Sequence, residues 1–294
     1  MSVVITGAGG RLGRLATEFA LERLPASDVI LVTRRPDELA HLAARGAQVR
    51  YGSFDEPDSL PAALTGAERM LLISTMGIGR RLEQHRNAVA AAVAAGVRHV
   101  AYTSGQTPTS ANPALVVGEH GATEDALRES GLAWTMLRMG LYAEFRVPPG
   151  VEAVATGRYL HNAGEGRTAY VSRVDCAGVA AAVLAKGGHE NTVYDVTGPE
   201  LLSQADVAAL FSDVTGRAVE AVEVSDEERT AAYVAAGHEE SYAASATSWG
   251  KAIRLGVLDP LTTVVRDLTG RPPRTLRQVL SEHRDELLGA VSSS

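Results

Sequence analysis

Apolar and polar positions in the first half of the chain follow two alternating periods. Short runs of β-branched and apolar residues give way to longer stretches in which apolar residues recur every three or four positions, as at Leu12, Leu15 and Phe19. The short runs predict strands at residues 3–6, 28–34, 47–53, 69–75, 98–104 and 133–140, and the longer stretches predict helices at residues 11–23, 36–46, 57–64, 81–96 and 120–131. Strands that alternate with helices in this way predict an α/β fold, a Rossmann-type doubly wound parallel sheet.

The alternation becomes less regular after Gly140. The second half predicts a strand near residues 168–172, a helix at about 174–185 that Asp175 caps, and another strand at 192–198, followed by helices and turns. We therefore expect a Rossmann domain over residues 1–145. Residues 146–294 would form a smaller C-terminal α/β lobe and one wall of a cleft, with residues 168–185 or so returning to the Rossmann sheet.

Composition narrows the class of protein. The chain has 294 residues, enough for about two average domains, and its net charge of −7 argues against nucleic acid as a partner. The single cysteine, Cys176, excludes an intrachain disulfide and suits the reducing cytoplasm, and we expect it in the apolar core. No apolar run reaches the roughly 18 residues that a membrane span needs, so no membrane partner is expected. The oligomeric state stays open.

A glycine-rich turn after the first predicted strand is the strongest single motif. Gly7, Gly10 and Gly13 are spaced GxxGxxG between that strand and the following helix. In such turns the first glycine permits a tight bend, the second admits a pyrophosphate, and the third lets helix and strand pack closely. The helix N-terminus supplies free N–H groups, so the motif predicts a dinucleotide-binding turn. Further cofactor contacts are expected from Thr6, Arg11 and Leu12.

The end of the second predicted strand favours NADP over NAD. An acidic residue at this place would bind the ribose hydroxyls, but the chain has Thr33, Arg34 and Arg35 there, and the first acid is Asp37. An arginine in this position accommodates a 2′-phosphate. We therefore expect NADPH as the cofactor, with Arg34 and Arg35 as contacts, although either arginine alone could simply be a solvated surface residue.

Further candidates lie where other predicted strands end, because open α/β sheets bind ligands at the carboxyl ends of their strands. The fourth and fifth strands end in possible cofactor contacts, namely Ser74, Thr75, Met76, Thr103 and Ser104. The sixth ends in possible substrate contacts, namely Met139, Gly140 and Tyr142. Tyr142 can stack on a flat ring, and ordinary packing is its alternative role. The sequence has no GxSxG, HExxH or GxxxxGK[ST] motif, and no residue spacing suggests a metal site.

Several stretches together resemble a known family. They are "ITGAGGRLG", "LLIST" followed by "QHRNAVAAAVAAGVRHVAYTS", "EHGATEDALRESGLAWTMLRMGLYAEF", "HENTVYDVTG" and "LTGRPPRTL". The chain resembles the NmrA-like atypical short-chain dehydrogenases/reductases through almost its whole length, and within them the NADPH-dependent quinone oxidoreductase 2 type. The resemblance implies a Rossmann domain, a small C-terminal lobe, bound NADPH and hydride transfer to a quinone-like acceptor.

The resemblance also implies roles for individual residues. A third-strand aspartate contacts the adenine amino group in many of these folds, and Ser53 stands at the matching place here. Adenine contacts would then come from Phe54 or Asp55. His85 matches the family pattern and is expected near the nicotinamide, with a position on the helix surface as its alternative.

The Tyr-x-x-x-Lys pair of most short-chain dehydrogenases is excluded. In that pair the lysine lowers the pKa of the tyrosine, which exchanges a proton with the carbonyl oxygen. The only lysines here are Lys186 and Lys251, and neither has a tyrosine four positions before it. By the resemblance, His120 stands at the lysine position and Val116 at the tyrosine position.

His120 and Tyr142 are the catalytic candidates. We expect His120 to contact the cofactor or the substrate, or to donate a proton, unless its ring is instead hydrogen-bonded to Glu124 at i+4. A quinone regains aromaticity on reduction, so positioning of two flat rings would contribute more than acid catalysis.

The leading prediction is an NADPH-dependent oxidoreductase that transfers hydride to a small quinone or similar conjugated carbonyl. Two alternatives stay open. The chain could be a reductase or epimerase for another small metabolite, because this scaffold hosts varied chemistry. It could also be a non-catalytic NADP(H) sensor of NmrA type that regulates a partner, an alternative that the missing Tyr/Lys pair keeps open.

Overall fold

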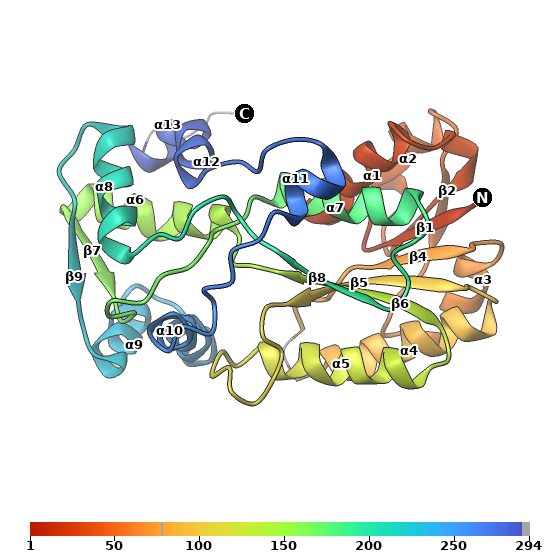
Figure 1. Cartoon of the computed structure of the whole chain (residues 1–294), viewed down its shortest axis with the longest axis horizontal. Helices are drawn as coiled ribbons and strands as arrows, with labels where there is room; N and C mark the ends of the chain where they lie inside the picture. Colours follow the sequence, from red (N-terminus) through yellow and green to blue (C-terminus); the bar gives the residue numbers. More distant parts are fainter. Residues whose placement is uncertain (78, 290–294) are drawn as a thin grey trace.

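A parallel β-sheet forms the centre of the molecule (Figure 1). The computed structural model describes residues 1–77 and 79–289. The strands of the sheet are β1 (Val3–Thr6), β2 (Val29–Thr33), β3 (Gln48–Tyr51), β4 (Arg69–Leu72), β5 (His99–Gly105), β6 (Ala133–Met139) and β8 (Thr192–Val196). Their spatial order is β3-β2-β1-β4-β5-β6-β8, and every neighbouring pair is parallel. The direction of strand addition reverses between β1 and β4, and open sheets of this kind bind ligands at that point.

Helices cover both faces of the sheet, because its central strands are apolar on both sides (Figure 1). One face carries α1 (Arg11–Leu21), α2 (Ala40–Ala43), α7 (Arg173–Ala185) and α11 (Val264–Thr269), and the other carries α3 (Leu60–Leu64), α4 (Arg81–Ala94) and α5 (Val117–Glu129). Leu12, Phe19 and Val179 are buried in the first layer, and Val89 and Leu127 are buried in the second. The sheet is thereby enclosed, and only its strand ends and loops can present polar groups to a ligand.

A second apolar core lies mainly in the C-terminal lobe, where Tyr159, Phe211 and Leu280 are buried, and it extends to Val117 at the start of α5 (Val117–Glu129). Its elements are α6 (Val147–Thr156), β7 (Arg158–His161), α8 (Gln204–Thr215), β9 (Glu220–Glu223), α9 (Asp226–Ala235), α10 (Glu240–Arg254), α12 (Leu276–Glu282) and α13 (Arg284–Leu287). Strands β7 and β9 form a separate parallel pair. Short 3-10 turns occur at η1 (Ala26–Asp28), η2 (Pro36–Leu39), η3 (Pro57–Ser59) and η4 (Ala143–Arg146).

The predicted doubly wound α/β fold is confirmed, and the second half brings two differences in its strands. The predicted strand at 168–172 is wrong, since this segment forms only isolated bridges, from Thr168 to Leu202 and from Val171 to Tyr142. Strand β8, which we expected within the lobe, pairs with β6 in the main sheet. An unpaired β6 would leave a row of open backbone groups, and β8 satisfies them.

The start of α7 differs from the prediction. Ser172 is the N-cap, because its hydroxyl accepts a hydrogen bond from the Asp175 N–H. The Asp175 carboxylate accepts hydrogen bonds from the Ser172 hydroxyl (2.7 Å) and from the Arg274 N–H (2.8 Å). Asp175 is therefore not the cap and instead joins α7 to the segment before α12. Cys176 is fully buried in the core, as expected, and burial raises the pKa of its thiol.

Candidate active site

The turn between β1 and α1 has the backbone geometry of a phosphate-binding site. Gly7 has a φ of +65°, a left-handed conformation that glycine adopts without strain. A Cβ on Gly13 would lie 2.2 Å from the Gly7 carbonyl oxygen, so only glycine fits at that position. Gly10 is the N-cap of α1, and the first N–H groups of a helix have no acceptor within it. These donors and the positive end of the helix dipole can hold a phosphate.

Two other predicted contacts in this turn have buried side chains. The Thr6 hydroxyl donates to the Leu71 carbonyl (3.0 Å) and accepts from the Ile73 N–H (3.3 Å), so it joins β1 to β4. Leu12 packs in the apolar layer beneath α1. Both side chains therefore support the turn from inside the fold.

Exposed arginines follow the ends of β1 and β2. Arg35 pairs with Glu38 at 2.8 Å, and Glu38 also pairs with Arg14 at 3.2 Å. Arg11 and Arg34 form no ion pair with any described residue, and both are exposed. Their guanidinium groups are therefore available to an anion, whereas Arg35 already has a carboxylate partner.

The loop after β3 is attached to α4 and its preceding turn. Asp55 accepts hydrogen bonds from the Arg80 guanidinium (2.6 Å) and the Gln84 amide (2.9 Å). The Phe54 ring lies edge to face with His85, at 6.3 Å between ring centroids. Ser53 is buried and forms a bridge with Glu56 inside the loop. Phe54 is thus the half-buried aromatic surface at this predicted adenine position.

The carboxyl ends of β4 and β5 are held together by side-chain hydrogen bonds. The Ser74 N–H donates to the Thr103 hydroxyl (2.8 Å), which in turn donates to the Ser74 hydroxyl (3.3 Å). The Thr75 N–H donates to Nε2 of His85 at 3.1 Å. Met76 follows with 83% of its side chain exposed, the most exposed large apolar residue in the described chain. These residues join the switch point of the sheet to α4.

Glu124 on α5 is the centre of a buried ionic cluster. Its carboxylate accepts hydrogen bonds from Arg138 (3.0 and 2.8 Å), Arg128 (2.7 Å) and Ser104 (2.7 Å). Burial alone would raise the pKa of Glu124, but the hydrogen bonds from Arg138 and Ser104 lower it below its ordinary value. Ser104 therefore places its hydroxyl against α5. The i,i+4 hydrogen bond between His120 and Glu124 that we considered is wrong, since these donors surround the carboxylate.

His120 instead contacts Tyr102, a residue that the sequence analysis did not select. The Tyr102 hydroxyl lies 2.7 Å from Nδ1 of His120 and 3.4 Å from Nδ1 of His85. His85 is fully buried, so its alternative position on the helix surface is wrong, and its Nδ1 lies 3.0 Å from the Thr123 hydroxyl. A Cβ on Gly105 would lie 3.8 Å from Nε2 of His120, which places that nitrogen beside the carboxyl end of β5.

Both imidazoles are neutral at physiological pH. Burial, together with the charge of Arg81, lowers the pKa of His85 to about 3. Burial and Arg81 likewise lower the pKa of His120 to about 3. Arg81 is itself 4% exposed and donates to the carbonyls of Thr75 (2.7 Å) and Val116 (3.0 Å). A buried cation thus stands beside the two histidines and opposes their protonation.

Tyr142 lies beyond the end of β6, beside Met139 and Gly140. Its hydroxyl donates to the Met139 sulfur (3.3 Å), and the Arg173 guanidinium lies 5.0 Å from its ring centroid. Burial raises the pKa of the Tyr142 hydroxyl well above its ordinary value, so it stays protonated. The ring is half-buried and has a cation as one neighbour.

Gln106 is a second residue that the sequence analysis missed. It follows β5, its side chain is 2% exposed, and neither end of its amide has a hydrogen-bond partner among the described residues. Its Oε1 would lie 3.2 Å from a Cβ on Gly140, at the end of β6. Buried amides are nearly always hydrogen-bonded, so this one is a natural partner for a ligand or a water molecule at the strand ends. The sequence analysis placed the end of the fifth strand at Ser104 and did not consider Gln106, two positions further along the chain.

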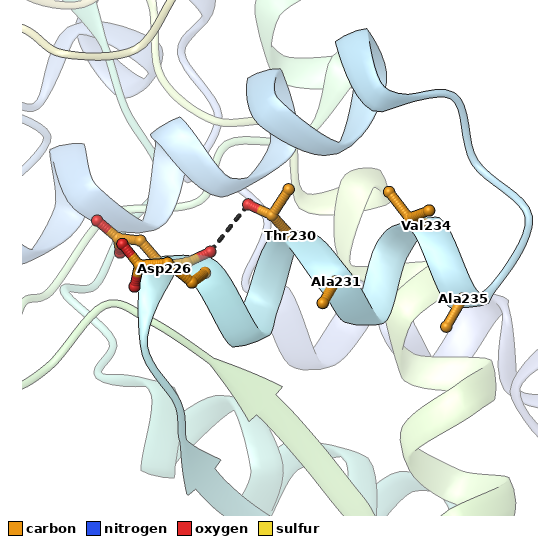
Figure 2. A pocket seen from close by; sticks show the side chains of 6 residues that line it. Asp226, Thr230, Ala231, Val234 and Ala235 are labelled. Atoms are coloured by element: carbon orange, nitrogen blue, oxygen red, sulfur yellow. Dashed lines mark hydrogen bonds between the residues drawn. The ribbon is translucent and has the colours of Figure 1, made fainter.

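A surface hollow lies away from the predicted site. It has a volume of about 670 Å³, runs along α9 in the lobe (Figure 2), and is lined by Asp226, Glu227, Thr230, Ala231, Val234 and Ala235. It contains none of the predicted site residues. In the part of the chain that the structure describes, no three His, Cys, Asp or Glu side chains are grouped to hold a metal ion. Across the same residues, the helices are too short or too polar to cross a membrane.

Comparisons with known proteins agree with this geometry. A model of a family described as NAD(P)H-binding matches residues 7–187. Quinone oxidoreductase 2 of Escherichia coli is 35% identical over 95% of this chain and 97% of its own. An NmrA-like family domain-containing oxidoreductase of Aspergillus flavus is 32% identical over 97% of each chain. The solved NADPH-dependent quinone oxidoreductase of Escherichia coli, in complex with NADPH, has a TM-score of 0.92, with 33% identity over 95% of this chain and 99% of that one. The family resemblance drawn from the motifs is confirmed.

Proposed function

The chain belongs to the NAD(P)H-binding family as an NmrA-like oxidoreductase, and from this we propose that it is an NADPH-dependent reductase of quinones or similar small conjugated carbonyls. The observation that carries the proposal is the neutral side chain of His120 at the carboxyl end of β5. The chain also lacks the Tyr/Lys pair, and it matches a quinone oxidoreductase over nearly its full length. Such a site suits an acceptor that needs positioning more than proton donation.

The cofactor fits the residues present. Gly7 and Gly13 shape the turn, Gly10 leaves the α1 N-terminus open, and the N–H groups there would hold the pyrophosphate. Arg34 would bind the 2′-phosphate, with Arg11 beside the turn and Arg35 in a smaller role because Glu38 already pairs with it. Bound NADPH supplies a hydride, which is the chemistry that the protein itself lacks.

The acceptor site would lie between the ends of β5 and β6. Tyr142 and Met139 would offer apolar surface to a flat ring, and the Gln106 amide would donate to a carbonyl oxygen. The Nε2–H group of His120 would donate to an oxygen of the cofactor or the acceptor. These residues orient and bind, and none is required to change its protonation state.

We also propose the setting in which the enzyme works. A single buried cysteine is compatible with the reducing cytoplasm. A Rossmann unit over residues 1–145 and a lobe over residues 146–294, from which α7 and β8 return to the sheet, divide the chain into a cofactor side and a substrate side. The predicted partner is a small molecule rather than nucleic acid.

A panel of acceptors tests the proposed function. Benzoquinones, naphthoquinones and non-quinone ketones would be supplied with NADPH and, in parallel, with NADH, while the oxidation of the cofactor is followed. We expect turnover with quinones, faster with NADPH. An NADP(H) sensor would bind both redox forms of the cofactor without turnover. A different reductase would prefer the non-quinone carbonyls, and either result would overturn the proposal.

A further inference from the structure

The hydrogen bonds around His85 fix the position of its proton. The Thr75 N–H can only donate, so Nε2 of His85 is an acceptor and carries no hydrogen. The neutral ring therefore has its proton on Nδ1. The Thr123 hydroxyl donates to the Glu119 carbonyl (2.9 Å), which leaves its oxygen free to accept the His85 Nδ1–H group at 3.0 Å.

The same logic extends to His120. Nδ1 of His85 carries a hydrogen and faces the Tyr102 oxygen at 3.4 Å, so it cannot be the acceptor for the Tyr102 hydroxyl. The nearest partner of that hydroxyl is Nδ1 of His120, at 2.7 Å, and the Thr123 hydroxyl is a further neighbour. With Tyr102 as the donor in this shortest hydrogen bond, the proton of the neutral His120 ring is on Nε2.

We infer that Tyr102 is a positioning residue, which holds His120 in the Nε2–H tautomer and so presents a neutral hydrogen-bond donor at the carboxyl end of β5 to an oxygen of the bound nucleotide or acceptor. The identity of that ligand rests on the proposed function, whereas the tautomer is a property of the free protein. Tyr102 does not touch the reacting atoms, because its side chain is fully buried.

The surroundings make this arrangement rigid. Tyr102 packs edge to face on His85, at 5.4 Å between centroids, and lies 5.8 Å from the His120 ring. Burial raises the pKa of the Tyr102 hydroxyl, so the residue stays a donor. Burial, with the charge of Arg81 as a smaller cause, lowers the pKa of both histidines, so His120 does not carry a second proton on Nδ1. A chain of contacts therefore runs from the backbone of Thr75, past the end of β4, through α4 and β5, to α5.

The substitution Tyr102→Phe tests the inference, because it removes one hydroxyl and keeps the ring. Tyr170→Phe is the matched control: Tyr170 is 1% exposed and its hydroxyl has no hydrogen-bond partner within residues 1–77 and 79–289. The first measurement is the 15N NMR spectrum of His120 in the free protein. We expect an acceptor-type Nδ1 and a proton-bearing Nε2 in the unmodified protein and in Tyr170→Phe, and a mixture of both tautomers in Tyr102→Phe.

The second measurement separates the two possible ligands. The Kd of NADPH, determined without an acceptor, and the KM of a benzoquinone would be compared among the same proteins. Loss of a preorganised donor predicts a rise of about three- to tenfold in one of these constants for Tyr102→Phe, with kcat nearly unchanged. A rise in Kd assigns the oxygen to NADPH, and a rise in KM alone assigns it to the acceptor.

Specific results would overturn the inference. A proton on Nδ1 of His120 in the unmodified protein contradicts it directly, with no need for a variant. Unchanged tautomers in Tyr102→Phe, or equal binding constants in Tyr102→Phe and Tyr170→Phe, contradict it as well. If no acceptor is reduced but the tautomer and the Kd of NADPH still change, the proposed function fails and the positioning role of Tyr102 stands.

Discussion

His120 owes its chemistry to residues that are distant from it along the chain. Tyr102 determines which ring nitrogen bears the proton, and burial with the charge of Arg81 keeps the ring neutral. A neutral imidazole can still donate one hydrogen bond, but it cannot supply the proton that an imidazolium would. His120 therefore acts as a donor of fixed direction rather than as an acid.

Replacement of His120 by alanine tests this limited role. One hydrogen bond contributes about 0.5–1.5 kcal/mol, so His120→Ala should raise KM or lower kcat by about tenfold at most. Steady-state kinetics with NADPH and a quinone would measure the change. Complete loss of turnover while NADPH still binds would contradict this role and would make His120 an obligatory acid.

The preference for NADPH depends on Arg34 in our interpretation. Arg34→Asp should narrow or reverse the ratio of the NADPH and NADH affinities, because it replaces a partner of the 2′-phosphate by a partner of the ribose hydroxyls. Arg35→Asp is the control, with a smaller expected effect because Arg35 already pairs with Glu38. Both Kd values can be measured by titration. Equal affinities in the unmodified protein would remove the basis of the interpretation.

The sequence predicted where candidate residues lie along the chain better than it predicted which side chains they contact. Motif and resemblance located His120 and His85, but they did not reveal Tyr102, because strand alternation shows only that a side chain is buried and not which helix residue it meets. The contact between Glu124 and Arg138 joins a helix to a strand in the same way. Such partners depend on how α5 lies on the sheet, which no local pattern encodes.

At the scale of elements, the glycines in the turn between β1 and α1 have different roles. Some are needed for the helix to pack on the strand, and others matter for the expected binding of phosphate. Gly13 is required by packing, since a Cβ there would lie 2.2 Å from the Gly7 oxygen. At Gly10 a Cβ would meet the same Gly7 oxygen at 3.3 Å, a contact that is tight but far less severe, and its φ of −77° suits any residue. Folding therefore requires glycine much less strictly at Gly10 than at Gly13.

Two alanine substitutions separate these roles. Gly13→Ala should destabilise the protein by about 1–3 kcal/mol or more through overpacking. Gly10→Ala should lower the melting temperature much less than Gly13→Ala does, and it should weaken NADPH binding, since its methyl group would crowd the turn at which we expect phosphate to bind. Thermal unfolding and NADPH titration of both variants would show this contrast, and equal losses of stability would refute the assignment.

The order of elements was predictable to the end of β6, because strands and helices there differ in period. The later elements were harder to place. Strand β8 carries the same kind of apolar run, but whether it joins the main sheet depends on the open edge of β6. At the start of α7, Ser172 and Asp175 are both suitable caps by type, and only the structure shows that Asp175 also binds the Arg274 N–H.

At the scale of the whole molecule, hydrogen bonds attach the lobe to the Rossmann unit around the strand ends. Thr107 donates to the Val257 carbonyl (2.7 Å), and the Leu115 N–H donates to the Ser248 hydroxyl (3.2 Å). The loop after β5 is thus anchored to the lobe next to Gln106. These hydrogen bonds hold the loop that carries Gln106 in a fixed position against the lobe.

Buried neutral histidines predict how stability depends on pH. The folded-state pKa of His85 and His120 is about 3, and that of His99 about 4, mainly because of burial. The unfolded chain binds protons near pH 6.5, which the folded protein does not, so the free energy of unfolding falls as pH drops from about 6.5 towards 4. Each histidine contributes about 1.4 kcal/mol per pH unit in this window.

His99→Gln checks this prediction away from the candidate site, because His99 contacts Thr135 on β6 rather than the Tyr102 cluster. Urea unfolding at pH 7.5, 6.0 and 5.0 should give a shallower loss of stability for His99→Gln than for the unmodified protein. NADPH binding should be equal in both. Identical pH slopes would contradict the prediction, because they would mean that His99 binds its proton at the same pH in the folded and the unfolded protein.

Transfer of a hydride from NADPH is the central claim, and a deuterium isotope effect tests it most directly. Single-turnover oxidation of NADPH by a quinone would be compared with oxidation of the two forms carrying deuterium on one side of C4. We expect the reaction to slow with one deuterated form and not with the other, because the protein presents one face of the ring to the acceptor. NADPH that binds but is never oxidised by a quinone, or is oxidised equally fast in all three forms, would contradict the claim.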